Sequence, residues 1–477
     1  MTGPAPTLDP APNEPDSQEP DAQEPAAEHA GAGVAAVLPP LGGPPRRDAA
    51  LLALGFGTTV AMWALAYLCR LPAIQAPGWL LGTGFLLLLI GGGAVAGRSS
   101  GRALEGAKSS TLSSALNLLI LGSVFKDVLR GNAAQAVFWV PGTLLLGALL
   151  GGVGGALGAR GAAGAKEVNW SARFALVAAT ATLLLLAAGG LVTSHDAGLA
   201  VPDWPNSFET NMFLYPLSRM TGGIYYEHAH RLFGSLVGLT TLVLAGHIVR
   251  NEERGWLRRL AVVAFVLVVV QGVMGGLRVT GRLTTSTNAA DLAPSIELAV
   301  AHGVTGQLFF CLLGAIAAFL STPWRAAAPG GDAAQAEDTR ILANGLVALL
   351  LVQLLLGALL RHLHTSSAWH ITGAVFVLLV AGGVGLRCWG FHGDRPVLPT
   401  LGKVLCGLVG FQFLLGWVAL AATLVKAGAL ADLQPPITTL HQTTGALVLA
   451  TAIQVRLWAG RVLPPDAPPA PAAPASG

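Results

Sequence analysis

Long apolar segments repeat along most of the chain, and their lengths predict membrane-spanning helices. About twelve segments reach the roughly 20 apolar residues that cross the hydrocarbon core of a bilayer. The third is the weakest because Lys126 and Asp127 interrupt it. The pattern predicts an all-α polytopic membrane protein. The segments lie at about 49–69, 78–97, 112–129, 136–159, 172–193, 229–249, 260–279, 298–320, 341–361, 368–387, 403–424 and 437–458.

Composition supports this interpretation. Of the 477 residues, 53% are hydrophobic and only 11% are charged, whereas an ordinary soluble domain carries about 25% charged residues. A single soluble domain is therefore excluded. The net charge of +3 and the absence of a basic stripe also exclude a nucleic-acid-binding protein. The 61 glycines suit close contact between helices in lipid.

The two ends of the chain differ from the apolar middle. Residues 1–48 are rich in Pro, Ala and acidic residues, with no basic residue before Arg46. Such a segment buries too little apolar surface to fold, so it is predicted to be disordered. It also lacks the basic-then-apolar order of a signal peptide. The Pro/Ala-rich tail at 461–477 is predicted to be disordered as well.

Lysines and arginines in the short loops indicate the orientation, since such loops are cytoplasmic when they are basic. With twelve spans, the basic loops all fall on one side, which places both termini in the cytoplasm. The opposite, outer side carries the loops 194–227, 280–297 and 362–367. The basic residues are Arg46, Arg47, Arg98, Arg102, Lys108, Arg160, Lys166, Arg173, Arg250, Arg254, Arg258, Arg259, Arg387, Arg395 and Lys403.

The last eight spans contain a weak internal repeat. In each copy, a span carries a glycine near its outer end, an outer loop follows, and the next span opens with a histidine. A further glycine stands about one turn after each histidine. Three copies also carry a glutamine four residues before the first glycine, and the first copy lacks it. The members are Gly189 with His230 and Gly234, Gln271 and Gly275 with His302 and Gly306, Gln353 and Gly357 with His370 and Gly373, and Gln412 and Gly416 with His441 and Gly445.

This repeat predicts two four-helix units, each offering two histidines at the same depth, which is what a six-coordinate haem between helices requires. A single membrane histidine is more often a packing or pore residue. Four at matching positions favour ligands, since burial of ionisable groups in lipid is costly. The nearby glycines leave room either for the porphyrin edge or for plain helix contact. The chain then divides into 1–48 (arm), 49–165 (extra transmembrane helices), 166–325 and 326–460 (the two halves) and 461–477 (tail).

Other histidines are weaker candidates. His362 and His364 lie close to His370 and are alternatives to it as a ligand. His370 is preferred because it sits inside a continuous apolar run with the glycine of the repeat behind it. The remaining histidines lie outside the repeat: His29, His195, His228, His247 and His392.

Glu227 lies three residues before His230, so the two share a helix face. A carboxylate beside a haem can accept protons, hold a water or orient a ligand. The alternative is an acid that favours a helix start. Three arginines near the same outer face either pair with haem propionates or extend to the lipid headgroups. They are Arg231, Arg278 and Arg361.

The outer loop from Val192 to Pro205 contains a rigid Pro-Asp-Trp-Pro turn. This loop either caps the pocket of the first unit or rests in the membrane interface, as tryptophan often does. The four cysteines lie in or at the ends of spans and form no CxxC, so neither a disulfide framework nor a thiol redox motif is expected. They are Cys69, Cys311, Cys388 and Cys406.

Over about residues 170–460 the chain resembles the heme A synthase family. The resemblance implies an eight-helix core of two pseudo-symmetric four-helix halves. It also implies oxidation of the C8 methyl of heme O to a formyl group, through an alcohol and a gem-diol, to give heme A for cytochrome oxidase assembly. The motifs that carry it are Gly198–Pro205, Glu227–Arg231, Gln271–Gly276, Ala301–Gly303, Gln353–His362 and Thr439–Gln442.

The resemblance also implies residue roles. His230 and His302 would hold the substrate haem, heme O. His370 and His441 would ligate the iron of a heme b cofactor that relays electrons. Glu227 matches the catalytically important carboxylate of the family.

The implied setting is the bacterial inner membrane, with the haem sites near the outer face. The implied partners are heme O synthase, an electron donor such as a quinol or a ferredoxin, the lipid bilayer, and a second copy of the chain.

Three features depart from the family pattern. The outer loops hold no cysteine pair, which points to a cysteine-free branch. Ile371 follows His370 where some relatives carry arginine. The four extra spans at 49–159 lie outside the family core, and they either form a scaffold, dock a partner such as heme O synthase, or bind lipid.

Two other functions compete with this one. The first is a diheme electron carrier of the cytochrome b type that oxidises quinol. The second is a transporter whose repeat reflects transport symmetry. The histidine repeat disfavours the transporter because it supplies ligands rather than broken helices. The pairing of Glu227 with His230 and the Pro-Asp-Trp-Pro loop favour the enzyme over the carrier, because a pure relay needs no acid at one haem only.

Overall fold

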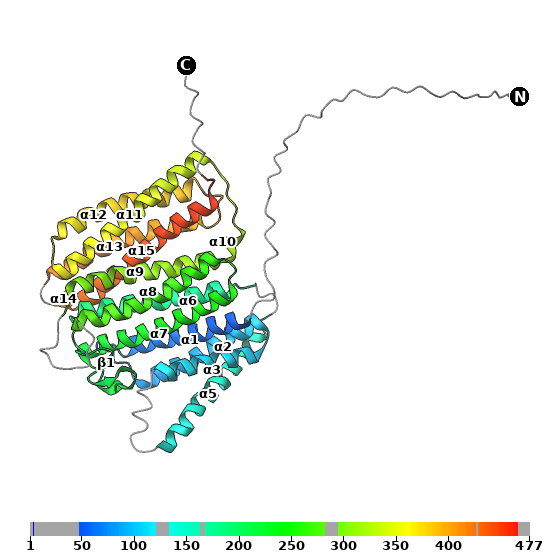
Figure 1. The fold of residues 1–477 in the computed structure, drawn as a ribbon, viewed down its shortest axis with the longest axis vertical. Helices are drawn as coiled ribbons and strands as arrows, with labels where there is room; N and C mark the ends of the chain where they lie inside the picture. The colour runs from blue at the N-terminus through cyan, green and yellow to red at the C-terminus, as the bar shows by residue number, and fades with distance from the viewer. Residues whose placement is uncertain are drawn as a thin grey trace. The chain divides into compact units, whose positions relative to one another are not determined.

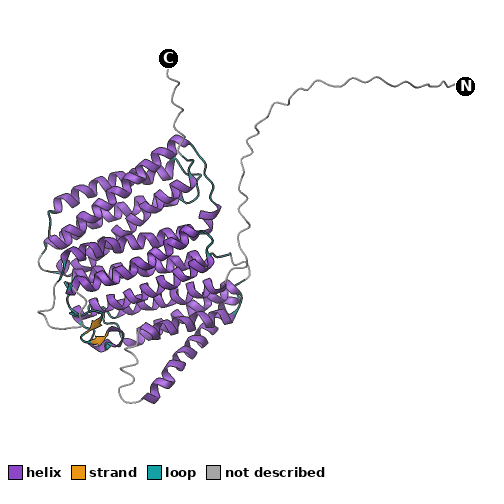
Figure 2. Ribbon diagram, in the orientation of Figure 1, coloured by secondary structure: helices purple, strands orange, loops and turns teal. Residues whose placement is uncertain are grey.

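The computed structural model describes residues 3, 47–120, 133–162, 167–281, 294–425 and 428–465. Within them, ten helices are long and apolar enough to cross a membrane. The strands of the described chain form one two-stranded hairpin (Figure 2). The prediction of an all-α polytopic membrane protein is therefore confirmed. Apart from residue 3, the predicted arm up to residue 46 and the predicted tail from residue 466 lie outside the described residues. The ends of both predictions were wrong, since residues 47–48 open the helix Arg47–Cys69 and residues 461–462 end the helix Gln434–Val462.

Among the described residues, twelve long helices lie at or near the places of the twelve predicted spans (Figure 1). Ala103–Ile120 and Gln434–Val462 are not among the ten that are long and apolar enough to cross a membrane. The first four are α1 (Arg47–Cys69), α2 (Gly78–Ser100), α3 (Ala103–Ile120) and α5 (Ala133–Ala159). The next four are α6 (Trp170–Ser194), α7 (Gly222–Asn251), α8 (Gly255–Thr280) and α9 (Ile296–Leu320). The last four are α11 (Ala333–Leu363), α12 (Ser367–Gly390), α13 (Leu398–Leu424) and α15 (Gln434–Val462).

Short elements join these helices. On the chain between α6 and α7 lie β1 (Asn206–Ser207), β2 (Thr210–Asn211), η1 (Met212–Leu214) and η2 (Leu217–Arg219). The helix α10 (Thr322–Ala326) follows α9, and α14 (Ala429–Asp432) precedes α15.

The third predicted span is shifted. It was expected at 112–129, with Lys108 in a loop, but α3 begins at Ala103 and Lys108 lies within it, 3.0 Å from a carboxylate oxygen of Glu105. The polar residues in the first turns of α3 lower its hydropathy, so the apolar pattern did not reveal where the helix begins. The serines of α3 are buried against neighbouring helices, and Ser110 Oγ donates to the carbonyl of Leu89 at 2.8 Å. Residues 121–129 of the predicted span lie outside the described residues.

The last eight long helices form two four-helix rings. In the first, α6, α7, α8 and α9 contact one another in order, and α9 closes on α6. In the second, α11, α12, α13 and α15 do the same, and α15 closes on α11. The rings meet where α6 and α9 pack against α15, with α11 also contacting α9. We call the first ring the N-terminal half and the second the C-terminal half.

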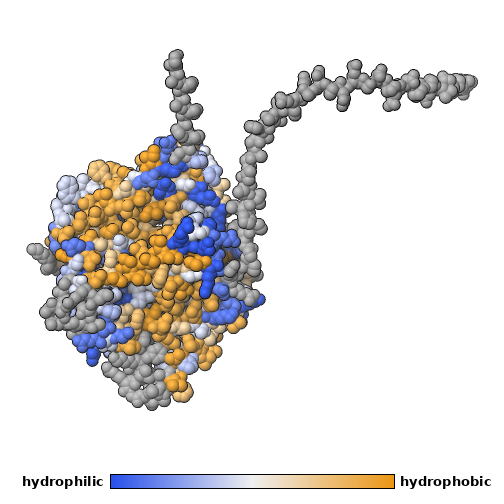
Figure 3. Space-filling model, in the orientation of Figure 1, coloured by the Kyte–Doolittle hydropathy of each residue, from blue (hydrophilic) through white to orange (hydrophobic). Residues whose placement is uncertain are grey.

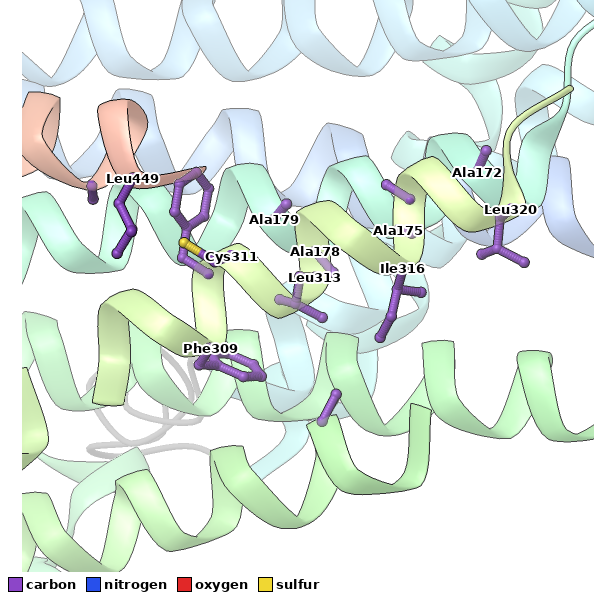
Figure 4. Packing of buried hydrophobic residues seen from close by; sticks show 14 of the residues in the cluster. Ala172, Ala175, Ala178, Ala179, Phe309, Cys311, Leu313, Ile316, Leu320 and Leu449 are labelled. Carbon is purple, nitrogen blue, oxygen red and sulfur yellow. The ribbon is translucent and has the colours of Figure 1, made fainter. Parts of the chain in front are cut away.

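Small residues on α6 bring α9 close to it (Figure 4). Ala175 and Ala178 of α6 and Leu313 and Ile316 of α9 are fully buried members of one hydrophobic cluster, and α6 packs directly against α9. Burial of apolar surface does not drive helices together within lipid, so such packing of small against large residues provides the contact.

The extra N-terminal helices attach to the N-terminal half through α1. The rings of Phe56 and Phe174 lie 5.3 Å apart, and the hydroxyl of Tyr225 donates to the carbonyl of Tyr67 at 2.6 Å. The helices α2, α3 and α5 pack through glycines, since a Cβ on Gly97 would lie 2.0 Å from the carbonyl oxygen of Gly155. The predicted extra region is therefore a helical module fixed to one half of the core.

Hydrophobic residues cover the middle of the face shown in Figure 3, and hydrophilic residues gather near α10 at one end of the helices and near the β hairpin at the other. Apolar side chains on the outside of the bundle, such as Trp369 and Leu379, are well exposed. This distribution is that of an integral membrane protein.

Candidate functional site

The four histidines of the repeat form two pairs of similar geometry. The rings of His230 on α7 and His302 on α9 have centroids 6.4 Å apart and planes at 80°. The rings of His370 on α12 and His441 on α15 have centroids 6.2 Å apart and planes at 77°. Each pair joins two helices that alternate around one ring, so each imidazole pair faces the inside of its own half.

A glycine on the preceding long helix lies against each imidazole. A Cβ added to Gly189 would lie 2.9 Å from Cε1 of His230, and one added to Gly416 would lie 3.1 Å from Cε1 of His441. The equivalent distances are 3.4 Å for Gly275 with His302 and 3.0 Å for Gly357 with His370. The contacts of Gly189, Gly357 and Gly416 are tight, whereas that of Gly275 is an ordinary van der Waals distance, so at three of the four sites the glycine sets how closely the helix approaches the ring.

Three of the glycines that follow the histidines contact glutamines of the repeat, while the predicted contact with a porphyrin edge stays a prediction. Gly373 lies against Oε1 of Gln353, and a Cβ on Gly445 would lie 3.3 Å from Nε2 of Gln412. Gly306 lies against Gln271 in the same way. These glycines therefore make room for the glutamines of the repeat. At Gly234, whose copy of the repeat lacks the glutamine, an added Cβ would meet nothing within 4 Å.

The spacing of both pairs fits an iron between the rings. A metal–imidazole nitrogen bond is about 2 Å long, so two such bonds plus the two ring radii span roughly 6 Å. Nδ1 of His230, His302 and His441 is buried and makes no hydrogen bond within the described chain. Two imidazoles complete six-coordination once a porphyrin supplies four nitrogens. The residues present therefore fit a haem in each half.

The alternative ligands His362 and His364 interact electrostatically with each other, and neither makes a ring contact with a histidine of the repeat in the described residues. His364 ends α11 with φ of 51° and is exposed. His370 lies six residues after His364, and its ring is the one that faces the ring of His441. The geometry therefore favours His370 over both.

Three histidines outside the repeat make local contacts instead, and His29 lies outside the described residues. His195 stacks on Tyr226 with centroids 4.0 Å apart, and His228 Nδ1 lies 3.0 Å from Ser207 Oγ. His392 Nε2 lies 2.8 Å from Thr339 Oγ1. These contacts indicate structural roles for His195, His228 and His392.

Glu227 is buried and both of its carboxylate oxygens are bonded. Oε1 accepts from Arg231 Nη2 at 2.6 Å, and Oε2 accepts the backbone N–H of Val201 at 2.9 Å. The Arg231 guanidinium also donates to the carbonyls of Val201, Asp203 and Asn206, at 2.8, 2.6 and 3.0 Å. We call this ion pair and its loop contacts the Glu227–Arg231 clamp. It fastens the outer loop to α7 one turn from His230.

The outer loop is an ordered cap with its own polar core. Asp203 is fully buried, and its carboxylate accepts the backbone N–H groups of Phe208 and Glu209 at 2.7 Å each. These two residues have positive φ, at 51° and 60°, and form the tight turn between β1 and β2. Burial raises the pKa of Tyr215, whose ring lies 4.9 Å from that of His228.

Trp204 anchors the cap to α8. A Cβ on Gly276 would lie 2.2 Å from the indole ring of Trp204, so only glycine leaves room for it there. The Pro-Asp-Trp-Pro motif signalled this loop, but its sequence did not reveal that Asp203 closes a hairpin or that Gly276 receives the tryptophan. The sequence left open whether this loop caps the first unit or rests in the membrane interface. Its contacts with α7 and α8 of the N-terminal half favour the cap.

Two further arginines lie near the outer ends of the halves. The guanidinium of Arg278 lies against Gly198, where a Cβ would come within 2.2 Å of Nη2. Arg361 Nη2 donates to Ser194 Oγ at 2.7 Å, and its buried Nε has no partner among the described residues. Neither arginine is within ion-pair distance of a carboxylate in the described chain, and the acidic groups that act on them electrostatically are Glu227 for Arg278 and Asp196 for Arg361.

Part of the chain is similar to proteins of known families. Residues 172–371 match the family model COX15-CtaA, described as cytochrome oxidase assembly protein. A protein described as heme A synthase from Bradyrhizobium sp. (strain BTAi1 / ATCC BAA-1182) is 24% identical over 212 residues, which are 39% of this chain and 55% of that relative. The match thus spans about half the length of the relative. No solved structure matches the chain. The resemblance noted from the sequence is confirmed over this region.

Proposed function

We propose that the protein is a heme A synthase, because its residues 172–371 match the cytochrome oxidase assembly family. It would oxidise the C8 methyl of heme O to a formyl group by two successive hydroxylations. One observation supports this most: the two histidine pairs repeat the same spacing, 6.4 and 6.2 Å, in the two halves. Two sites of equal geometry suit one substrate haem and one cofactor haem.

The substrate is assigned to the N-terminal pair, His230 and His302, because the clamp and the cap lie on that half. The cofactor, heme b, is assigned to His370 and His441 in the C-terminal half. When bound, this cofactor supplies one-electron transfer toward the substrate site. A diheme electron carrier of the cytochrome b type would need neither the buried acid nor the folded cap on one half alone, which is why the enzyme is preferred.

Glu227 is proposed to act from its place in the clamp. With both oxygens bonded, the carboxylate holds Arg231 and the backbone of Val201, and so it fixes the cap above His230. In the same position it can take up a proton on Oε1 or Oε2 when the pair with Arg231 loosens. The residue is thus proposed both to order the site and to handle protons.

Arg278 and Arg361 are proposed to bind the haem propionates. Each stands about one turn after the glycine that packs on a histidine of the same half, namely Gly275 and Gly357. Bidentate hydrogen bonds from a guanidinium to a carboxylate are strong in a partly buried setting. The outer ends of the halves would then hold the charged edge of each haem.

The setting is proposed to be the bacterial inner membrane, with both termini in the cytoplasm and the haems near the outer face. Heme O synthase, a quinol or ferredoxin donor and a second copy of the chain are the proposed partners. The extra helices are proposed to serve as a scaffold, since α1 packs on α6 and α7 of the substrate half.

The function is tested in a host that makes heme O but no heme A. Expression of the full chain is expected to yield heme A or its hydroxylated precursor in extracted haems identified by mass. Glu227→Gln serves as the matched variant and is expected to bind haem but form no product. Only heme b and unchanged heme O, with electron donors active, would contradict the proposal.

A prediction on haem binding follows from the glycine contacts. In Gly416→Ala the new Cβ meets Cε1 of His441 at 3.1 Å, so the ring must move and heme b retention should fall severalfold. The control is Gly410→Ala on the same helix, where a Cβ meets nothing within 4 Å. Haem per chain after purification, from the pyridine haemochrome spectrum, measures the effect. Equal retention in both variants would show that the Gly416 contact does not constrain the ligand.

A further inference from the structure

Glycines line the junction of α7 and α8 beside the N-terminal histidine pair. Gly234 and Gly238 follow His230 by about one and two turns on α7. Gly272 stands three residues before Gly275 on α8. A Cβ added to Gly234, Gly238 or Gly272 would meet nothing within 4 Å. Open space therefore lies next to the pair on this side.

Two contacts of the cap show that these glycines face the junction. Arg231, which holds the cap to α7, stands seven residues before Gly238, so the two share a helix face. Trp204 of the cap lies against Gly276, which stands four residues after Gly272 and shares its face of α8. The cap thus bridges the ends of α7 and α8, and the glycines lie below it. We call this glycine-lined part of the junction the α7–α8 seam.

The seam faces lipid and is closed farther from the cap. Along the same helix faces, Ala245 of α7 and Ala261 of α8 are buried in the hydrophobic core. On the outside of the junction, Leu242 and Val269 are 46% and 50% exposed. The other sides of this half are covered, because α1 packs on α6 and α7 and α15 packs on α6 and α9. The seam therefore lies between the histidine pair and the lipid.

The C-terminal half carries larger side chains at the equivalent places. The rings of Phe413 and Trp417 have centroids 6.2 Å apart, and Leu378 packs against the hydrophobic core. The two halves therefore share the spacing of the histidines but differ in the space beside them. Counted from His370 and Gly416, the residues that replace Gly234, Gly238, Gly272 and Gly276 are Ala374, Leu378, Phe413 and Trp417.

We propose that the α7–α8 seam receives the isoprenoid tail of heme O, with the end of the tail in the lipid. This inference rests on the proposed function, in which heme O binds to His230 and His302. Heme O carries a long isoprenoid chain on the edge of its porphyrin, whereas heme b carries none. In the ring of helices α8 lies between α7 and α9, so a haem held between these two imidazoles presents an edge to α8. The glycines leave that edge unobstructed.

The seam also determines which half accepts a haem with a tail. In the C-terminal half, Leu378 and Phe413 stand where the tail would lie, so a tailed haem has to displace packed side chains there. Heme b has no tail and meets no such obstacle. The tail is in apolar surroundings both in lipid and in the seam, so little is gained by moving it. Exclusion from one half therefore separates the two haems.

The test supplies heme O, without oxygen or reductant, to the purified full chain in lipid nanodiscs and identifies the bound haems by mass. Gly238→Leu and Gly272→Phe place the residues of the C-terminal half in the seam. Each is expected to lower bound heme O at least about tenfold and to leave heme b unchanged. Gly246→Leu and Gly410→Phe are matched controls away from the seam, where a Cβ also meets nothing within 4 Å, and both should bind heme O normally.

A variant that gains space guards against chains that merely fold poorly. Leu378→Ala combined with Phe413→Ala opens the equivalent place in the C-terminal half and is expected to let a second heme O replace heme b. Normal heme O binding in either filled variant, or no second heme O in the opened one, would overturn the inference. Bound heme O that is never oxidised when oxygen and reductant are supplied would contradict the proposed function instead.

Discussion

Alanine at His302 and alanine at His441 are expected to deplete two different haems. His441→Ala removes one ligand of the C-terminal pair, whose rings lie 6.2 Å apart, and should lower bound heme b to near zero. His302→Ala breaks the N-terminal pair instead, so heme b should be retained while heme O is lost. Haems extracted from each purified variant and separated by mass give both amounts.

The control for this pair is His364→Ala, since His364 is exposed at the end of α11 and makes no ring contact with the four histidines of the repeat among the described residues. It should keep both haems at the level of the unaltered chain. Equal loss of the same haem in the His302 and His441 variants would contradict the division of roles between the halves.

Arg231→Ala is expected to have the largest effect on stability. The Arg231 side chain is 9% exposed, and its loss would leave the buried Glu227 carboxylate with the Val201 N–H alone. Breaking a buried ion pair from one side typically costs about 3–5 kcal/mol. The three loop carbonyls would lose their donor as well, so the cap should detach. Thermal unfolding in detergent and limited proteolysis of residues 198–214 measure the two effects.

The exposed pair of Lys108 and Glu105 supplies the control, since surface ion pairs contribute about 0–1 kcal/mol. Lys108→Ala should leave both the melting temperature and the protease pattern almost unchanged. Glu227→Gln separates structure from chemistry, because the amide oxygen can still accept from Val201 while the charge is gone. An Arg231→Ala variant with normal stability and an uncut loop would show that the clamp does not hold the cap.

Periodic features of the fold could be predicted from the sequence. Apolar runs indicated the spans because a bilayer requires about 20 apolar residues wherever a helix crosses it. Regular recurrence of glycine, glutamine and histidine likewise identified His230, His302, His370 and His441 as one group. In the structure these residues form two pairs, each in contact with the glycines of its repeat.

Features that depend on distant contacts could not be predicted in this way. The start of α3 was missed because its buried serines look polar until α2 and α5 are packed on them. The loop carbonyls that accept hydrogen bonds from Arg231 belong to residues 25 to 30 positions away in the sequence, so no local pattern predicts them. The glutamines were seen as part of the repeat, but only the packed helices show that Gln353 and Gln412 reach an imidazole while Gln271 reaches Thr305.

The most direct measurement is a single turnover with the purified full chain. The protein is loaded with heme b and heme O without oxygen, reduced, and then exposed to oxygen, and the haems are extracted and identified by mass. We predict that heme O is converted to its hydroxylated form, because the two reduced irons supply the two electrons that one hydroxylation with oxygen needs, and that heme A forms when excess reductant is then added. The porphyrin of heme b should stay chemically unaltered. Unaltered heme O after oxygen and excess reductant have both been supplied would contradict the account and indicate a diheme electron carrier.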